Sequence, residues 1–297
     1  MTVLAVDLGG TNMRAAIVGE DGSLSARETR RTPRDEPRPD GLIALIRDVA
    51  AGSGATSAVI GVPGRVDHAT GRCEHAPNLP PSWAPHLHAR GLADAIGLPV
   101  HLANDADLAA VGEAFYGAGR GHRDIVYMTV STGVGAGALL GGQILHGRHS
   151  IAEVGHTVID LEALRRGQPA TLETLGSGTA LARMAKEAGI QASGADFVAL
   201  VVAGDRHALS VWSRVVDALA VGVCNVAFAF SPEVVVLGGG LGRTGELLYA
   251  PIRAFLAQHG PPAMEIRVVG AALGDDGGLV GAAGWDRAFQ ADDGVAT

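Results

Sequence analysis

The sequence predicts an α/β protein made of two related halves, each opening with a strand, a glycine-rich turn and a second strand. Three observations carry this prediction: each of three glycine-rich turns follows directly on an apolar, strand-forming run. The turns are 7–11, 131–135 and 238–240, and the runs are 3–6, 125–130 and 234–237. Small ligands usually bind in the crevice between such units, so we expect a cleft between the two halves.

In the first half, alternating apolar residues separated by tight turns predict three antiparallel strands. Leu42, Leu45, Ile46 and Val49 have helical spacing, and the Pro- and charge-rich stretch before them predicts a loop. The expected elements are strands at 2–7, 13–18 and 24–30, a loop at 33–40, a helix at 41–51, strands at 59–62 and 100–102, and a helix at 106–116.

The second half repeats the opening order and then becomes mainly helical. Its expected elements are strands at 124–130 and 135–140, helices at 178–188, 195–203 and 207–230, a strand at 233–237, a helix at 244–258, a strand at 266–269 and a final helix at 278–290. Because the final helix is expected to return to the first domain, the predicted domains are 1–112 with 280–297, and 113–279.

Composition indicates a globular protein and argues against several classes of partner. The 297 residues are 47% hydrophobic and 18% charged. A net charge of −8 without a long Lys/Arg run argues against nucleic-acid binding. The longest apolar stretch, 218–230, is too short to span a bilayer, and the N-terminus lacks signal-peptide features. We therefore expect a cytoplasmic protein that does not bind membranes.

The two cysteines, Cys73 and Cys224, lie in unrelated contexts. This arrangement favours two reduced thiols over a disulfide or a cysteine-based zinc site.

Glycine-rich turns point to anion binding, because without a Cβ the backbone N–H groups can approach a phosphate closely. Three such turns, far apart in the sequence, predict one nucleotide held from several sides. Asp7, in the first turn, is available to a metal ion. These features favour an ATP-dependent phosphotransferase.

Asp105 follows a short strand and precedes a helix, so it is a candidate for a catalytic base, although this position alone is more typical of a helix N-cap. Phosphoryl transfer to a hydroxyl needs a group that orients the acceptor and accepts its proton. The alternative is a helix N-cap formed by Asn104 or Asp105. Asp107 is a weaker candidate, expected to be solvated.

The ordered motifs resemble those of the ROK family, within the sugar kinase/Hsp70/actin superfamily. They are Asp7–Arg14 (DLGGTNMR), Gly61–Gly64 (GVPG), Ala76–Pro80 (APNLP), Ala103–Ala106 (ANDA), Ser131–Gly135 (STGVG), Glu153–His156 (EVGH) and Leu237–Gly240 (LGGG). The resemblance implies a two-domain actin-like ATPase (ribonuclease H-like) fold with an interdomain cleft. It also implies a glucokinase-like sugar kinase that uses ATP and Mg²⁺, and a homodimer.

The resemblance also implies roles for individual residues, with Asp105 as general base and Asp7 holding Mg²⁺ through water. The implied sugar-binding residues are Gly64, Asn78, Asn104, Asp105, Glu153, His156 and Glu173. The implied nucleotide-binding residues are Asp7, Gly9, Gly10, Thr11, Thr132, Gly133, Gly238, Gly239 and Gly240.

Plain structural interpretations stay open for several of these residues. Asn78 could form an Asx-turn, His156 could be a satisfied polar side chain and Glu173 a surface charge. The 238–240 turn could be a tight strand-to-helix connection. Arg14, inside a predicted strand, could pair with a carboxylate and receives no role.

The chain departs from the family pattern at 157–172, where many members carry cysteines that bind zinc with the preceding histidine. This segment contains no cysteine, so we expect no zinc and a loop held by other contacts. The departure leaves the acceptor open between glucose and mannose, an N-acetylhexosamine, allose or a cyclitol.

Other functions and another donor also stay open. One is a sugar-responsive regulator without catalysis, although only six residues precede Asp7, too few for a helix-turn-helix domain. Another is an ATPase without an acceptor, and polyphosphate is an alternative phosphoryl donor.

Overall fold

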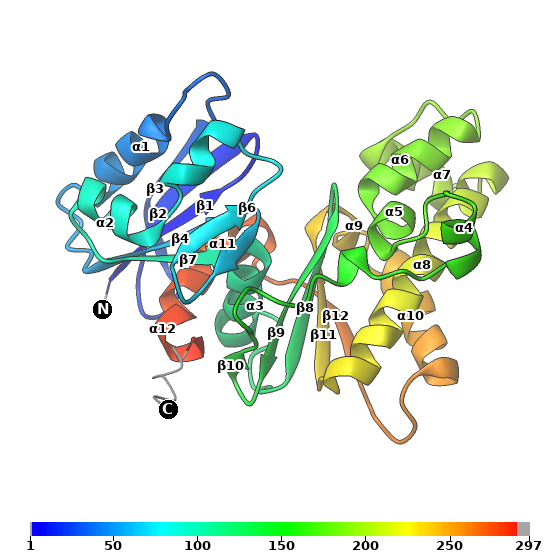
Figure 1. The fold of residues 1–297 in the computed structure, drawn as a ribbon. Coiled ribbons are helices and arrows are strands. Elements are labelled where there is room, and N and C mark those ends of the chain that lie inside the picture. The colour runs from blue at the N-terminus through cyan, green and yellow to red at the C-terminus, as the bar shows by residue number, and fades with distance from the viewer. Residues whose placement is uncertain (1, 290–297) are drawn as a thin grey trace. The chain divides into compact units, whose positions relative to one another are not determined.

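The computed structural model describes residues 2–289, which form two compact units (Figure 1). Unit 1 comprises Met1–Arg123, Leu139–Ile151 and Asp275–Thr297, and unit 2 comprises Asp124–Ala138 and Ala152–Gly274. The predicted domain limits stay a prediction, and their last residues, 290–297, lie outside the described part of the chain.

Unit 1 is built on a five-stranded sheet in the order β3-β2-β1-β4-β7. Its strands are β1 (Val3–Leu8), β2 (Asn12–Val18), β3 (Leu24–Arg31), β4 (Ser57–Val62) and β7 (Val100–Asn104). The first three strands pair antiparallel, as predicted, whereas β1, β4 and β7 run parallel. The three parallel strands therefore end at the same edge of the sheet.

Helices cover both faces of this sheet (Figure 1). On one face, α1 (Asp40–Ala50) and α2 (Ala89–Ile96) bury Leu45 and Leu92 against alternate strand residues such as Leu4 and Ile60. This is the face predicted from the helical spacing in 41–51. On the other face lie α3 (Asp105–Tyr116) and α11 (Gly277–Gly281).

The end of the chain differs from the predicted continuous helix at 278–290. The structure has three short helices there, α11, η4 (Ala282–Gly284) and α12 (Trp285–Ala288), and residue 290 lies outside the described residues. Glycines at 277, 278, 281 and 284 lower the helix propensity of the segment. They also let it approach α3 closely.

The backbones of α3 and α11 touch at this crossing. A Cβ placed on Gly281 would lie 1.8 Å from the Leu108 carbonyl oxygen, and one placed on Gly112 would lie 2.3 Å from the Gly277 carbonyl oxygen. Glycine is therefore required at both positions. Because α3 begins at Asp105, this contact fixes the helix that carries the predicted base.

The remaining elements of unit 1 are short. They are β5 (Arg65–Asp67), β6 (Arg72–His75), η1 (Pro81–His86), β10 (Gln143–Ile144) and η3 (Gly274–Asp276), whose first residue falls in unit 2. Strands β5 and β6 form a two-stranded hairpin that the sequence analysis did not predict.

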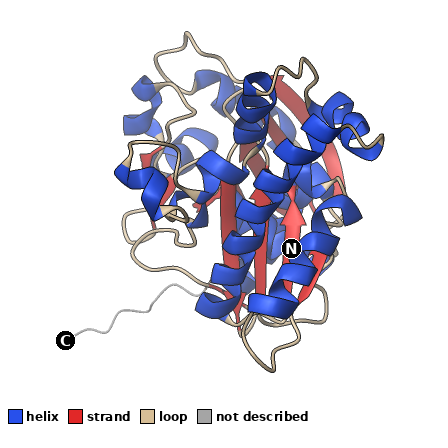
Figure 2. Cartoon of the chain, turned by 90° about the vertical axis from the view of Figure 1, so that its right-hand side faces the viewer, coloured by secondary structure: helices blue, strands red, loops and turns tan. Residues whose placement is uncertain are grey.

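The second sheet has the order β10-β9-β8-β11-β12, with β8 (Ile125–Val130), β9 (Val134–Leu140), β11 (Val234–Gly238) and β12 (Arg267–Gly270). Strands β8, β11 and β12 are parallel and belong to unit 2. The other elements of this unit are η2 (Val154–His156), α4 (Leu161–Arg165), α5 (Leu172–Gly176), α6 (Gly178–Glu187), α7 (Gly194–Val202), α8 (Arg206–Phe230), α9 (Gly239–Gly242) and α10 (Glu246–His259). Figure 2 views this unit with helices in front of the strands.

Within the described residues, α8 alone is long and apolar enough to cross a bilayer by length and composition. Its bounds agree with the predicted helix at 207–230, and it is longer than the apolar stretch 218–230 on which the expectation of no membrane span rested. Half of its apolar window is buried inside the structure, including Val215 and Val223. Core helices meet the same criterion of length and composition, so the finding is weak evidence for a membrane span.

Both cysteines are free and buried, in agreement with the expected reduced thiols. Burial raises the pKa of the Cys73 thiol and that of the Cys224 thiol.

An aromatic cluster in unit 1 makes its stability depend on pH. The His68 ring lies 5.1 Å from His146 and 5.0 Å from Phe289, measured between ring centroids. Burial, and then the nearby charge of His146, lower the pKa of His68 to about 4. Between pH 6.5 and 4 the unfolded chain binds a proton that folded His68 does not, so the unfolding free energy falls as the pH is lowered.

We expect His68→Phe, which keeps a ring and removes the titration, to gain stability relative to the wild type as pH falls from 7 to 4.5. After allowance for the partial exposure of His68, the relative gain is about 1–2 kcal/mol. Urea unfolding at both pH values measures it. The matched control is the same change at His207, which is exposed. If the stability of His68→Phe relative to the wild type did not change with pH, this would contradict the lowered pKa of His68 in the folded protein.

Candidate active site

In unit 1, the predicted site residues gather where the parallel strands end. Asp7 of β1 pairs with Gly61 of β4, and Val62 of β4 pairs with Asn104 of β7. A Cβ placed on Gly61 would lie 3.7 Å from the Asp105 Cα. The carboxyl edge of a parallel sheet is where ligands bind in open α/β folds.

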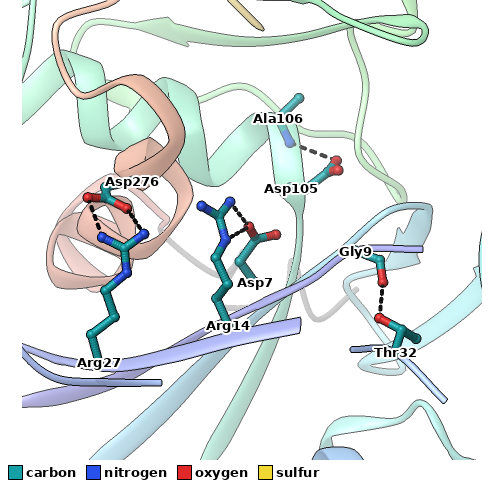
Figure 3. Close-up of polar contacts among 8 residues, drawn as sticks. All are labelled: Asp7, Gly9, Arg14, Arg27, Thr32, Asp105, Ala106 and Asp276. Atoms are coloured by element: carbon teal, nitrogen blue, oxygen red, sulfur yellow. Dashed lines mark hydrogen bonds and ion pairs between the residues drawn. The ribbon is translucent and has the colours of Figure 1, made fainter. Parts of the chain in front are cut away.

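Asn104, not Asp105, caps helix α3. Its Oδ1 accepts hydrogen bonds from the N–H groups of Ala106 and Asp107, at 2.8 and 3.3 Å, and its Nδ2 donates to the Gly64 carbonyl at 3.0 Å. Asp105 is the first residue of the helix, and its Oδ1 accepts from the Ala106 N–H at 2.9 Å (Figure 3). Helix N-termini favour negative charge, so this position suits an ionised carboxylate.

The prediction that Asp107 is solvated is wrong. Its side chain is buried, with 1% of its surface exposed. Asp107 lies in the first turn of α3, and the polarity of a single residue does not reveal whether that position is buried.

Asp7 is held by Arg14, the residue left without a role in the sequence analysis. The Nε and Nη2 groups of Arg14 both donate to Asp7 Oδ2, Nε at 3.1 Å (Figure 3). Asp7 and Arg14 are neighbours in the β1–β2 register. The Asp7 side chain is 22% exposed, and Oδ1 lies outside this ion pair. A partly exposed carboxylate oxygen on an oriented side chain fits a Mg²⁺ ion that keeps most of its waters.

The first glycine-rich turn, with exposed Thr11 at its end, is closed by its own backbone and by β3. Gly9 N–H donates to the Asn12 carbonyl at 2.9 Å, and Thr32 Oγ1 donates to the Gly9 carbonyl at 2.6 Å (Figure 3). A Cβ placed on Gly10 would lie 2.7 Å from the Asn78 carbonyl oxygen. The structure therefore brings this turn against the segment of Asn78, whose side chain is exposed.

In unit 2, the two other glycine-rich turns meet at the end of β8. Thr129 of β8 pairs with Gly238 of β11, and Gly239 has a φ of 77°. A Cβ placed on Gly239 would lie 2.5 Å from the Val130 carbonyl oxygen. Gly238 precedes the one-turn helix α9, so the 238–240 turn is also a tight strand-to-helix connection.

The turn at 131–133 is held from three directions. Gly178 N–H donates to the Ser131 carbonyl and Thr179 Oγ1 to the Thr132 carbonyl, each at 2.7 Å. Glu173 Oε2 accepts from the Val134 N–H at 2.9 Å. Glu173 is therefore not a bare surface charge, because it bonds the backbone that closes the turn.

Glu153 caps η2 and His156 is its last residue, and 3.8 Å separate Glu153 Oε2 from His156 Nε2. Both side chains are more than half exposed. A Cβ placed on Gly155, between them, would lie 2.1 Å from the Val134 carbonyl oxygen. Val134 thus contacts both the Glu153–His156 segment and Glu173.

Backbone hydrogen bonds hold the cysteine-free loop at 157–172. Leu172 N–H donates to the Thr157 carbonyl, and Ile159 N–H to the Ala170 carbonyl, each at 2.9 Å. Inside the loop, Asp160 Oδ1 caps α4 by accepting from the Ala163 N–H at 2.8 Å. These are contacts of the kind expected for a loop without cysteines.

The sequence analysis missed a charged cluster on the β5–β6 hairpin. Buried Asp67, with Glu74 and His149, places three potential metal-ligand atoms within 4.8 Å of one another. Arg148 Nε lies 3.0 Å from Asp67 Oδ2. Burial alone would raise the pKa of Asp67, but the Thr70 N–H and Arg148 outweigh it and lower that pKa. The cluster connects the segment before Glu153 to the hairpin. It could not be predicted from a local motif, because its residues are some eighty positions apart in the sequence.

Comparison with known proteins places these features in a family. A family model described as "ROK family" matches residues 3–288. Glucokinase from Thermotoga maritima is 35% identical, with 95% of this chain and 96% of that protein aligned.

Two solved structures are similar over nearly the whole chain, and each is 30% identical. The ROK family glucokinase from Streptomyces griseus, in complex with glucose and AMPPNP, has a TM-score of 0.78, covering 97% of this chain and 99% of its own. ROK hexokinase from Thermus thermophilus has a TM-score of 0.80, covering 95% and 97%. These matches confirm the two-domain actin-like ATPase fold and agree with the predicted class, an ATP-dependent carbohydrate kinase. The chain belongs to the ROK family.

Proposed function

We propose that this protein transfers the γ-phosphoryl group of MgATP to a hexose hydroxyl, with D-glucose as the first acceptor to test and Asp105 as general base. The observation that carries the proposal is the division of roles at the end of β7. Asn104 takes the helix cap, so the Asp105 carboxylate is not needed for that purpose. It lies at the carboxyl edge of the sheet next to Gly61 of β4, the strand between β7 and β1, which carries Asp7.

In the proposed reaction, Asp105 orients the acceptor hydroxyl and accepts its proton as the new oxygen–phosphorus bond forms. The turns at 7–11, 131–135 and 238–240 are the proposed nucleotide-binding turns, because the N–H groups of glycine residues can approach phosphates closely. Asp7, oriented by Arg14, would hold Mg²⁺ through water. A bound Mg²⁺ neutralises charge on the transferred phosphoryl group.

Asn78, Glu153, His156 and Glu173 are the proposed acceptor ligands. Amide and carboxylate groups can bond several hydroxyls at once, as a sugar requires. Asn104 takes part through the remaining N–H of its amide, and Gly64 through its backbone. A homodimer and a cytoplasmic location stay predictions.

An acceptor panel tests the proposed substrate class. ADP release from MgATP should depend on acceptor, and we expect D-glucose to give the highest kcat/KM. Mannose, N-acetylmannosamine, N-acetylglucosamine, allose and inositol complete the panel. A higher kcat/KM for one of these compounds would identify it as the preferred acceptor in place of glucose, and the proposed kinase activity would stand. If the protein bound a sugar but released no ADP, this would contradict the proposed kinase activity and favour a sugar-responsive regulator.

A further inference from the structure

Glu173 joins two parts of unit 2 that the proposed function assigns to different substrates. It lies on α5, and the resemblance implies that it binds the sugar. Its Oε2, however, accepts a hydrogen bond from the Val134 N–H, within the 131–135 turn proposed to bind phosphates. A Cβ placed on Gly133 would lie 2.3 Å from the same oxygen. The carboxylate therefore lies directly against the turn.

The position of Glu173 is rigid. Helix α5 opens with a capping box, in which Thr174 N–H donates to Thr171 Oγ1 and Thr171 N–H donates to Thr174 Oγ1 at 2.9 Å. Arg183 donates to the Thr174 carbonyl at 2.8 Å. These bonds fix the backbone on either side of Glu173, and the Val134 N–H holds its carboxylate against the turn.

The charge of Glu173 opposes the proposed ligand of the turn. Phosphate groups are anionic, and a carboxylate against their binding turn repels them through Coulomb interaction. It also occupies one N–H that the turn could otherwise offer. Hydrogen bonds donated by sugar hydroxyls to the carboxylate would spread its charge and weaken this repulsion.

We infer that Glu173 couples the two substrates: its charge weakens nucleotide binding until an acceptor hydroxyl bonds the carboxylate. This inference rests on the proposed function, because it requires ATP phosphates at the 131–135 turn and a sugar at Glu173. It assigns Glu173 a positioning role on the turn in addition to the implied sugar contact. Coupling of this kind is reciprocal between the two ligands.

Titration calorimetry with MgAMPPNP, without and with saturating acceptor, tests the inference. In the wild type, acceptor should tighten nucleotide binding by about 5- to 50-fold. Glu173→Gln keeps an oxygen for Val134 but removes the charge. Its sugar-free affinity for MgAMPPNP should therefore exceed that of the wild type, by about 3- to 10-fold on the same scale of coupling.

Glu173→Asp keeps the charge but shortens the side chain by one methylene, so that the bond to Val134 is lost. Because the charge stays near the turn, Glu173→Asp should bind the nucleotide more weakly than Glu173→Gln, and its Val134 amide should exchange faster with solvent hydrogen than that of the wild type. A merely structural role would weaken nucleotide binding in both variants. Glu265→Gln, an equal charge change at an exposed residue of unit 2 outside the proposed sites, is the matched control and should leave the affinity unchanged.

The outcomes separate this inference from the proposed function. If Glu173→Gln binds nucleotide alone no more tightly than the wild type, the coupling inference is wrong and the kinase proposal stands. If the wild type binds no nucleotide at all, both are wrong. Tighter nucleotide binding by Glu173→Gln than by both the wild type and Glu173→Asp would support the inference.

Discussion

Replacing Asp105 by Asn should lower kcat for sugar phosphorylation by about 10³-fold, within the range contributed by a general base. Asn has nearly the same shape but cannot accept the hydroxyl proton. The cap of α3 is supplied by Asn104 and remains in place, so the melting temperature should stay close to that of the wild type. Steady-state ADP release and thermal unfolding measure the two effects.

The control for this change is Asp94→Asn, which removes an equal charge from an exposed position on α2. It should leave kcat unchanged. If Asp105→Asn kept more than a tenth of the wild-type kcat, Asp105 would not be the base. If it instead lost stability with little loss of activity, the residue would have the structural role that its place beside a helix cap allows.

The second large effect is expected at the contact between α3 and α11. In Gly281→Ala, the new Cβ would lie 1.8 Å from the Leu108 carbonyl oxygen and 2.7 Å from its carbon, both backbone atoms. Helix α11 would have to move away from α3. We expect the unfolding free energy to fall by about 3 kcal/mol or more, at the upper end of overpacking costs.

Gly278→Ala in the same helix is the matched control, because nothing lies within 4 Å of a Cβ at that position. Its stability should equal or slightly exceed that of the wild type, since Ala has the higher helix propensity. Thermal and urea unfolding compare the pair. Equal stability of Gly281→Ala and Gly278→Ala would contradict the close helix contact. Because α3 carries Asp105, Gly281→Ala should also lower kcat.

The sequence predicts the parts of the fold that local chemistry determines. The β1–β2 hairpin follows from an apolar run that ends in Asp7 and two glycines, and α1 follows from the spacing of Leu42, Leu45, Ile46 and Val49. The positions of the glycine turns could be predicted because a turn against a strand end needs residues without a Cβ. Gly239 meets this need through its positive φ.

The features that could not be predicted from the sequence depend on contacts between residues far apart in the chain. The burial of Asp107, the ion pair of Arg148 with Asp67 and the bond from Val134 to Glu173 each join residues whose orientation is set by packing. The final helix was predicted as one continuous segment at 278–290. Its glycines instead serve the contact with α3, which becomes visible only when both helices are in place.

The central claim is that the γ-phosphoryl group of ATP passes to a sugar hydroxyl. Phosphorus NMR of the protein with MgATP and D-glucose measures this transfer directly. The account predicts a sugar phosphate monoester that forms in equal amount with ADP and is absent with Asp105→Asn. ADP formed together with inorganic phosphate, at a rate independent of every acceptor in the panel, would contradict the account and identify an ATPase.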